Sequence, residues 1–334
     1  MLLHEHLENG ADKNPNFPFS EFEGNSLSYQ EANLLSNQLA NKLVSEGLEV
    51  GDRFAFLAKN CTEMAIMYYA ASKVGAVPVP LNYRLADQEW AYIINDSEAK
   101  LIIVKGNEYS DRINQISSEL KNVKKYISIS LDNSIEKFQD FYDWLSDSSN
   151  EKPTLKIHEN DDVYQMYTSG TTGHPKGAVL LQRNVAANIR QYLNSLTLPM
   201  PSRTLLVAPM YHAAAMINMC GCIAIGGTIV IQEDFIPQDV VDCLANEKIT
   251  HTVLVPAMIQ ACLVSVPNVA SNEYNDLDQI HYGASPIAPE TLKKAMDVFK
   301  CKFGQGFGMT ETVAVICLMT PEAVSYTHLT LPTT

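Results

Sequence analysis

Residues 168–177, with the sequence TSGTTGHPKG, combine the residue types that hold phosphate groups. Glycine lets the backbone turn tightly and expose its N–H groups, and the serine and threonine hydroxyls add further donors. Successive backbone N–H groups in such a turn form a concave anion-binding site. Lys176 brings a mobile positive charge to a phosphate, and Pro175 restricts the backbone beside it. The spacing therefore predicts a polyphosphate-binding loop.

An ordinary exposed turn is the alternative, because glycine, serine and threonine are common turn residues. The order is not that of a Walker A loop, since Gly177 follows Lys176 where that loop has serine or threonine. Residues 167–177 (YTSGTTGxPKG, with His174 at the variable position) resemble instead the signature loop of the adenylate-forming superfamily. That superfamily includes acyl-CoA synthetases, firefly luciferase and the adenylation domains of peptide synthetases. The resemblance implies that ATP phosphates bind at Thr168, Ser169, Gly170, Thr171, Thr172, Gly173 and Lys176.

A second glycine-rich stretch, GQGFGMTE at residues 304–311, has further candidate binding residues. Phe307 offers an aromatic face for a purine, and Glu311 offers an oxygen ligand suited to magnesium. A glycine-rich strand end with a Thr-Glu helix cap is the alternative. The stretch resembles the superfamily's Gly-aromatic-Gly-x-Thr-Glu motif, which implies magnesium on Glu311 with Thr172 nearby. The nucleotide contacts that it implies are Gly306, Phe307, Gly308, Met309 and Thr310.

Two shorter segments follow expected strands, where open α/β sheets bind ligands. The first is Gly283-Ala284-Ser285, and its resemblance to a family turn implies contact with adenine and with the acyl group. The second ends in His212, for which a buried core histidine is the alternative. A histidine at this place in the family helps to shape the acyl pocket beside the reacting carboxylate.

The residues around His212 also bear on the substrate. Amino-acid-activating members carry Phe-Asp here, the aspartate pairing with the substrate ammonium, whereas this chain has Tyr211-His212. The alanines that follow remove bulk, and Met216 adapts to irregular apolar ligands. This favours a fatty acid. The expected acyl-pocket residues are His212, Ala213, Ala214, Met216, Gly283 and Gly308.

Composition narrows the class of protein. The 334 residues are 46% hydrophobic, and 38 acidic against 24 basic residues give a net charge of −14. This balance disfavours nonspecific nucleic-acid binding and provides no polybasic lipid anchor, while peripheral membrane association and oligomeric state stay open. Seven cysteines without paired Cys-x-x-Cys motifs favour reduced thiols in a cytoplasmic protein over a zinc site. The most apolar run, residues 216–231, is too short to span a membrane.

Strands and helices are expected to alternate and so to position these residues. Residues 163–167 and 178–181 should be strands on either side of the phosphate loop. The alternation predicts an α/β fold with doubly wound, mostly parallel sheets flanked by helices. Other expected strands are 54–58, 76–81, 101–104, 204–208, 228–231, 252–255 and 279–282. The expected helices are 28–47, 62–75, one capped by Asp87, 138–145, 213–223, 237–247, 257–264 and 289–299.

The resemblance extends from about residue 10 to residue 322. It implies that residues 1–324 form the large N-terminal domain of an adenylate-forming enzyme, incomplete at its C-terminal end, with a subdomain boundary near residue 150. The family's later Thr-Gly-Asp motif, hinge and lysine-bearing lid do not occur in this sequence. Residues 325–334, SYTHLTLPTT, match nothing in the family and are interpreted as a non-native tail.

The function implied is ATP-dependent activation of a carboxylic acid, in the fatty-acid class, to acyl-adenylate and then to the CoA thioester. ATP, Mg²⁺ and CoA are the expected cofactors and co-substrates, and Lys176, His212, Thr310 and Glu311 are the expected catalytic residues. Positioning and charge neutralisation supply most of this chemistry. The alternatives are an aryl or short-chain acid-CoA ligase and an inactive nucleotide- or acyl-binding fragment.

Overall fold

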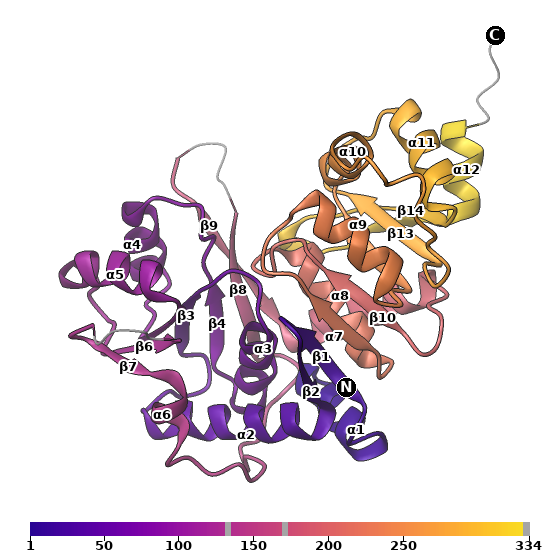
Figure 1. Cartoon of the computed structure of the whole chain (residues 1–334). Helices are drawn as coiled ribbons and strands as arrows, with labels where there is room; N and C mark the ends of the chain where they lie inside the picture. Colours follow the sequence, from indigo (N-terminus) through magenta and orange to yellow (C-terminus); the bar gives the residue numbers. More distant parts are fainter. Residues whose placement is uncertain (131–134, 169–172, 330–334) are drawn as a thin grey trace. The chain divides into compact units, whose positions relative to one another are not determined.

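The computed structural model describes residues 1–130, 135–168 and 173–329. It divides into two compact units (Figure 1). The first comprises Met1–Pro15 and Tyr29–Ala186, and the second comprises Asn16–Ser28 and Ala187–Thr334. Residue 150, where a subdomain boundary is expected, lies inside the first unit.

The first unit contains a five-stranded sheet in the order β4-β3-β5-β6-β7, and every neighbouring pair is parallel. Its central strands are short apolar runs that are almost wholly buried, as expected when helices cover both faces of a parallel sheet. The strands are β3 (Arg53–Leu57), β4 (Val77–Pro80), β5 (Leu101–Lys105), β6 (Lys125–Ile129) and β7 (Phe138–Asp140).

The expected helices of the first unit are present with two corrections, and residues 3–13 and 107–116 form further helices that were not expected. Asp87 is the first residue of its helix and Ala86 occupies the N-cap position. The helix expected over residues 138–145 begins only at Phe141, because Phe138 lies in β7 and the Asp140 carboxylate caps the first turn. The helices are α1 (Leu3–Lys13), α2 (Tyr29–Ser45), α3 (Thr62–Val74), α4 (Asp87–Asp96), α5 (Asn107–Ile116), η1 (Ser117–Glu119) and α6 (Phe141–Leu145).

The strands expected around the phosphate loop are confirmed. They are β8 (Asp162–Thr168) and β9 (Lys176–Leu181), which pair as an antiparallel hairpin in the first unit. The hairpin packs against β4 through β8. It is followed by α7 (Gln182–Ser195), within which the chain passes from the first unit to the second.

The second unit is built on an eight-stranded sheet in the order β15-β14-β13-β12-β10-β11-β1-β2. Its six inner strands are parallel, and an antiparallel strand closes each edge. The mostly parallel α/β architecture is therefore confirmed. The strands are β1 (Pro18–Phe22), β2 (Asn25–Ser28), β10 (Arg203–Leu206), β11 (Thr228–Ile231), β12 (His251–Leu254), β13 (Gln279–Gly283), β14 (Lys302–Phe307) and β15 (Cys317–Met319).

The helices of the second unit have clear local causes. Proline at the first helical position begins α9, α10 and α11, where its missing N–H costs no hydrogen bond. Among the described residues, no helix is long and apolar enough to cross a membrane. The helices are α8 (Ala213–Ala224), α9 (Pro237–Asn246), α10 (Pro256–Ser265), α11 (Pro289–Phe299), η2 (Thr310–Thr312) and α12 (Pro321–Leu329).

Candidate active site

The ends of the phosphate loop lie opposite each other at the tip of the β8–β9 hairpin. Thr168 and Lys176 are register partners, so the strands bring the first and the basic residue of the motif together. The Lys176 side chain is exposed, and Gly173 adopts a φ of +142° that side chains rarely tolerate. The expected ligands Ser169, Gly170, Thr171 and Thr172 lie outside the described residues.

Glycine is required at position 177, next to the tip of the hairpin. A β-carbon there would lie 2.3 Å from the amide nitrogen of Gln165 and 2.9 Å from the ring of Tyr167. That amide donates to the Tyr167 hydroxyl at 3.0 Å, and the Arg53 guanidinium donates to the Gln165 carbonyl at 3.2 Å. A connected polar network therefore fixes the strand register just below the loop.

The other expected site residues lie in the second unit, at one edge of its sheet. Because β10, β13 and β14 run parallel, their carboxyl ends meet at the same edge. His212 follows β10, Gly283 ends β13 and Phe307 ends β14. Gly283 and Gly306 are direct register partners. This edge is where parallel α/β sheets bind ligands.

Close backbone approach explains several glycines of this edge. A β-carbon on Gly283 would lie 2.3 Å from the carbonyl oxygen of Gly306, and one on Gly308 would lie 1.4 Å from that of Ala314. Neighbouring Ala284 adopts a φ of +65°, which is strained for a residue with a side chain. Tight packing and local strain thus coincide where the motifs predict a ligand.

Side chains of the second motif project from this packed backbone. Phe307 is 64% exposed and Met309 is 52% exposed, so both apolar side chains are accessible to a ligand. Thr310 and Glu311 lie in the short helix η2, with the Glu311 carboxylate exposed. The segment has the exposed aromatic face and the exposed carboxylate that a nucleotide site requires.

The expected acyl-pocket residues differ in how exposed they are to solvent. His212 occupies the N-cap position of α8 and is exposed, with its ring centroid 4.3 Å from that of Tyr211. Ala214 is also exposed, whereas Ala213 and Met216 are buried in the second unit. Gly283 and Gly308 are of intermediate burial, so only His212 and Ala214 of the six are exposed.

The donor set fits a magnesium ion that arrives with its nucleotide. The described residues contain no cluster of three histidine, cysteine, aspartate or glutamate side chains that would hold a metal by themselves. Magnesium commonly keeps several waters and binds through one or two carboxylates together with substrate phosphates. The exposed Glu311 would supply the carboxylate of such a site.

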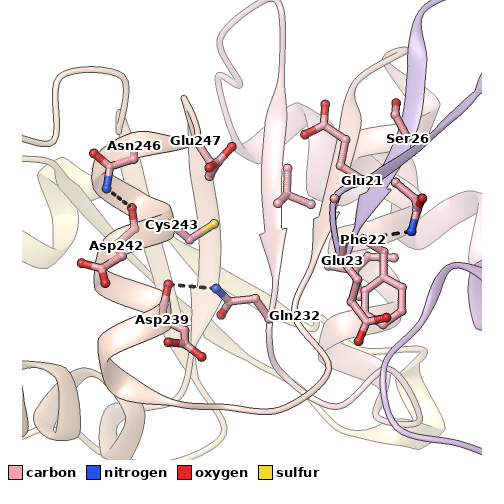
Figure 2. A pocket seen from close by; sticks show the side chains of 14 residues that line it. Glu21, Phe22, Glu23, Ser26, Gln232, Asp239, Asp242, Cys243, Asn246 and Glu247 are labelled. Carbon is pink, nitrogen blue, oxygen red and sulfur yellow. Dashed lines mark hydrogen bonds between the residues drawn. The ribbon is translucent and has the colours of Figure 1, made fainter.

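A cavity of about 480 Å³ lies elsewhere in the second unit, between the β1–β2 hairpin, β11 and α9 (Figure 2). Glu21 in its wall accepts two hydrogen bonds from Arg203, each 2.8 Å long. The acidic lining disfavours phosphate, and none of the expected site residues lines the cavity. Its acidic residues are Glu21, Glu23, Asp239, Asp242 and Glu247.

Sequence reasoning missed the contacts that hold the phosphate loop from outside its motif. Tyr92 and Asp96 of α4 reach the two arms of the hairpin. Their only sequence signal is a spacing of four residues, which places them on one helix face. Nothing in that spacing identifies the hairpin as the partner.

Two curated relatives match most of this chain in sequence. The fatty acid–[acyl-carrier-protein] ligase ScoC of Streptomyces coeruleorubidus is 30% identical over 321 residues, covering 94% of this chain and 59% of the relative. The long-chain-fatty-acid–CoA ligase FadD13 of Mycobacterium tuberculosis is 30% identical over 288 residues, covering 86% of this chain and 55% of the relative. The chain therefore spans somewhat more than half the length of each.

A solved structure and a family model also match nearly the whole of this chain. The inhibitor-bound N-terminal domain of FACL13 from Mycobacterium tuberculosis superposes with a TM-score of 0.88 at 26% identity, covering 97% of this chain and 79% of that one. The model of the AMP-binding enzyme family matches residues 7–333, which include both glycine-rich motifs. Matched along nearly its whole length, this chain belongs to the AMP-binding enzyme family.

Proposed function

We propose that this chain provides the ATP and acid sites of an enzyme that activates a fatty acid as its acyl-adenylate and passes the acyl group to CoA. The observation that carries the proposal is the hairpin that places Thr168 and Lys176 opposite each other at the ends of a Gly/Thr-rich loop. The exposed Phe307 and Glu311 of the second unit support it.

The resemblance to the family motifs implies a role for each residue, and the chemistry of each side chain is consistent with that role. Lys176 binds the β- and γ-phosphates with the loop N–H groups, Phe307 stacks on adenine, and Thr310 donates to the α-phosphate. A carboxylate oxygen of the acid attacks the α-phosphorus, an O–P bond forms, and the bond to the β-phosphate oxygen breaks to release pyrophosphate. Magnesium held by Glu311 supplies neutralisation of phosphate charge when bound.

The second step transfers the acyl group to a thiol. The CoA sulfur attacks the acyl carbon, a C–S bond forms, and the C–O bond to AMP breaks. The protein needs no nucleophile of its own for either step, because orientation and electrostatic stabilisation lower both barriers. One relative's name specifies an acyl-carrier protein as the acceptor and the other specifies CoA. The proposal that CoA is the acceptor is therefore separate from the proposal that the acid is adenylated.

The substrate class rests on the surroundings of His212. Tyr211 and His212 provide no carboxylate for a substrate ammonium, and the exposed Ala214 presents little bulk. The two relatives described above are named as fatty-acid ligases, and others of similar identity are named for ferulic and 2-succinylbenzoic acids. These features favour an apolar acyl chain over an amino acid.

A binding series tests both the activity and the substrate class without requiring turnover. Sulfamoyl adenosines carrying dodecanoyl, benzoyl, acetyl or alanyl groups mimic the adenylate and differ only in the acyl part. We expect the dodecanoyl compound to bind most tightly in calorimetric titrations of the 334-residue chain. Preference for the benzoyl or acetyl compound would favour an aryl or short-chain acid ligase, and equal affinity for all four would indicate a nucleotide-binding role alone.

A further inference from the structure

One face of helix α4 contacts both arms of the phosphate-loop hairpin. Tyr92 stacks on His174, with ring centroids 4.6 Å apart and an angle of 18° between the rings. Its hydroxyl also lies 3.4 Å from the carbonyl oxygen of Pro175, to which it donates. These contacts hold the chain immediately before Lys176.

The other arm is held one helical turn further along α4. The Asp96 carboxylate accepts a hydrogen bond of 2.6 Å from the Tyr167 hydroxyl, and hydrogen bonds to charged acceptors are among the stronger ones. Burial and the neighbouring Asp96 charge raise the pKa of Tyr167, so the hydroxyl keeps its proton and remains a donor. Tyr167 directly precedes Thr168 at the start of the loop.

Helix α4 is itself rigidly placed. Trp90 is fully buried and donates from its indole nitrogen to the carbonyl oxygen of Asn82 at 2.8 Å. The Arg112 guanidinium lies 4.0 Å from the Trp90 ring centroid and forms an ion pair of 2.7 Å with Asp87. A buried and cross-linked helix is a suitable support for a ligand-binding loop.

We propose that Tyr92 and Asp96 are positioning residues for ATP, which hold both ends of the phosphate loop from one helix. They keep Thr168 and Lys176 at the separation that the hairpin register gives them. Without them Thr168 and Lys176 would have to be fixed in place at the moment of ATP binding, and that cost would weaken the measured affinity. The positioning role rests on the proposed function, because it requires the loop to bind ATP.

A double-mutant cycle tests the arm held by Asp96. Asp96→Ala, Tyr167→Phe and the double variant are compared with the unsubstituted chain in titrations with ATP-Mg. We expect each single variant to bind about three- to tenfold more weakly, which is the size of the net contribution of one intramolecular hydrogen bond. The double variant should bind no more weakly than either single one, because both remove the same interaction.

Matched variants test the Tyr92 arm and the specificity of the effect. Tyr92→Phe keeps the ring stacked on His174 and should restore most of the affinity lost in Tyr92→Ala. Tyr142→Phe is the control, because its hydroxyl also donates to a carboxylate, that of Glu63 at 3.0 Å, but joins α6 to α3 outside the hairpin. It should leave ATP-Mg affinity unchanged.

Hydrogen exchange of the amides in β8 and β9 provides a readout that does not depend on ATP. Faster exchange there in Asp96→Ala, with unchanged exchange in β3 and β5, supports the positioning role. Unchanged exchange and unchanged affinity in Asp96→Ala, Tyr167→Phe and Tyr92→Ala would overturn it while leaving the proposed function intact. Failure of the unsubstituted chain to bind ATP-Mg would overturn the proposed function and the ATP-positioning role together.

Discussion

Gly173 of the hairpin and the glycines of the second motif are needed for different physical reasons, although Gly177 at the end of the first motif is confined as well. In the hairpin, Gly173 has a positive φ and open space around it, so its role is conformational. In the second motif, Gly304 and Gly308 have no room for a side chain, because the His281 ring and the Ala314 carbonyl lie against them. Among the described residues, the first motif presents the exposed Lys176 near the tip of a hairpin, and the second presents the exposed Phe307 and Glu311 at a tightly packed strand end. Similar composition therefore arises from different constraints.

The largest expected effect comes from disturbing the close packing around Gly308 in the second motif. Gly308→Ala places a β-carbon where the Ala314 carbonyl oxygen lies, so we expect a loss of about 3 kcal/mol or more in the free energy of unfolding. Urea denaturation measures it. Gly306→Ala is the control, because its β-carbon would meet only Leu318 at an ordinary 3.5 Å. Equal stability of the two variants would contradict the packing explanation.

Acid should lower the free energy of unfolding of the second unit, because that unit contains buried histidines. His281, packed against Gly304, and His251 are buried, and burial lowers the pKa of His281 to about 4 and that of His251 to about 3. Both folded-state pKa values lie below the usual 6.5, so the unfolded chain binds more protons between pH 6.5 and 4. Stability is therefore fully present above pH 6.5 and decreases as the pH falls, by roughly 3 kcal/mol for His281 alone.

Unfolding free energies measured from pH 7.5 to 4 check this expectation. His281→Gln should flatten the dependence even if it lowers stability at neutral pH, whereas substitution of the exposed His158 by glutamine should not. An identical pH slope in the wild-type and His281→Gln chains would show that other groups cause the acid sensitivity.

On the hairpin side, Lys176→Ala should affect ligand binding more than folding. The side chain is exposed, so stability should stay within about 0.5 kcal/mol of wild type. ATP-Mg affinity should fall by about 2 kcal/mol, the usual contribution of a charge-assisted contact. Calorimetry of Lys176→Ala beside Lys156→Ala, which removes an exposed lysine outside the hairpin, would detect the difference. Unchanged affinity would remove Lys176 from the site.

The smallest effect concerns Glu311 and magnesium. Glu311→Gln keeps the shape of the side chain and removes its charge, and an exposed charge contributes at most about 1 kcal/mol. The gain in ATP affinity on adding magnesium should therefore shrink about threefold to fivefold. Titrations with ATP at low and saturating magnesium measure that gain, and an equal gain in both chains would make Glu311 structural.

Local patterns were enough to predict most elements that carry the motifs. The short apolar runs around the phosphate loop are strands, and α3 ends at Gly75 in the left-handed conformation. The expected helix over residues 138–145 was too long, because spacing of aromatic residues alone does not separate a strand residue such as Phe138 from the helix after it.

Contacts between distant segments were beyond local reasoning. Neither the β1–β2 hairpin nor the pairing of β1 with β11 was foreseen. The second pairing joins segments that are about two hundred residues apart in the sequence. The positions of Tyr92 and Asp96 against the hairpin are likewise set by tertiary packing. Motifs identify the residue types of a site, while their neighbours depend on how the chain folds back.

The exchange of the segment Asn16–Ser28 between units has a consequence for synthesis on the ribosome. These residues emerge early, yet β1 cannot pair until Thr228–Ile231 has been made, because Ser20 is opposite Ile229. The sheet of the second unit therefore cannot include β1 until β11 has been synthesised. This is a non-local step of the kind that slows folding and favours aggregation. Expressing residues 187–334 alone would leave β11 as an open edge, so the unit cannot be excised by a single cut.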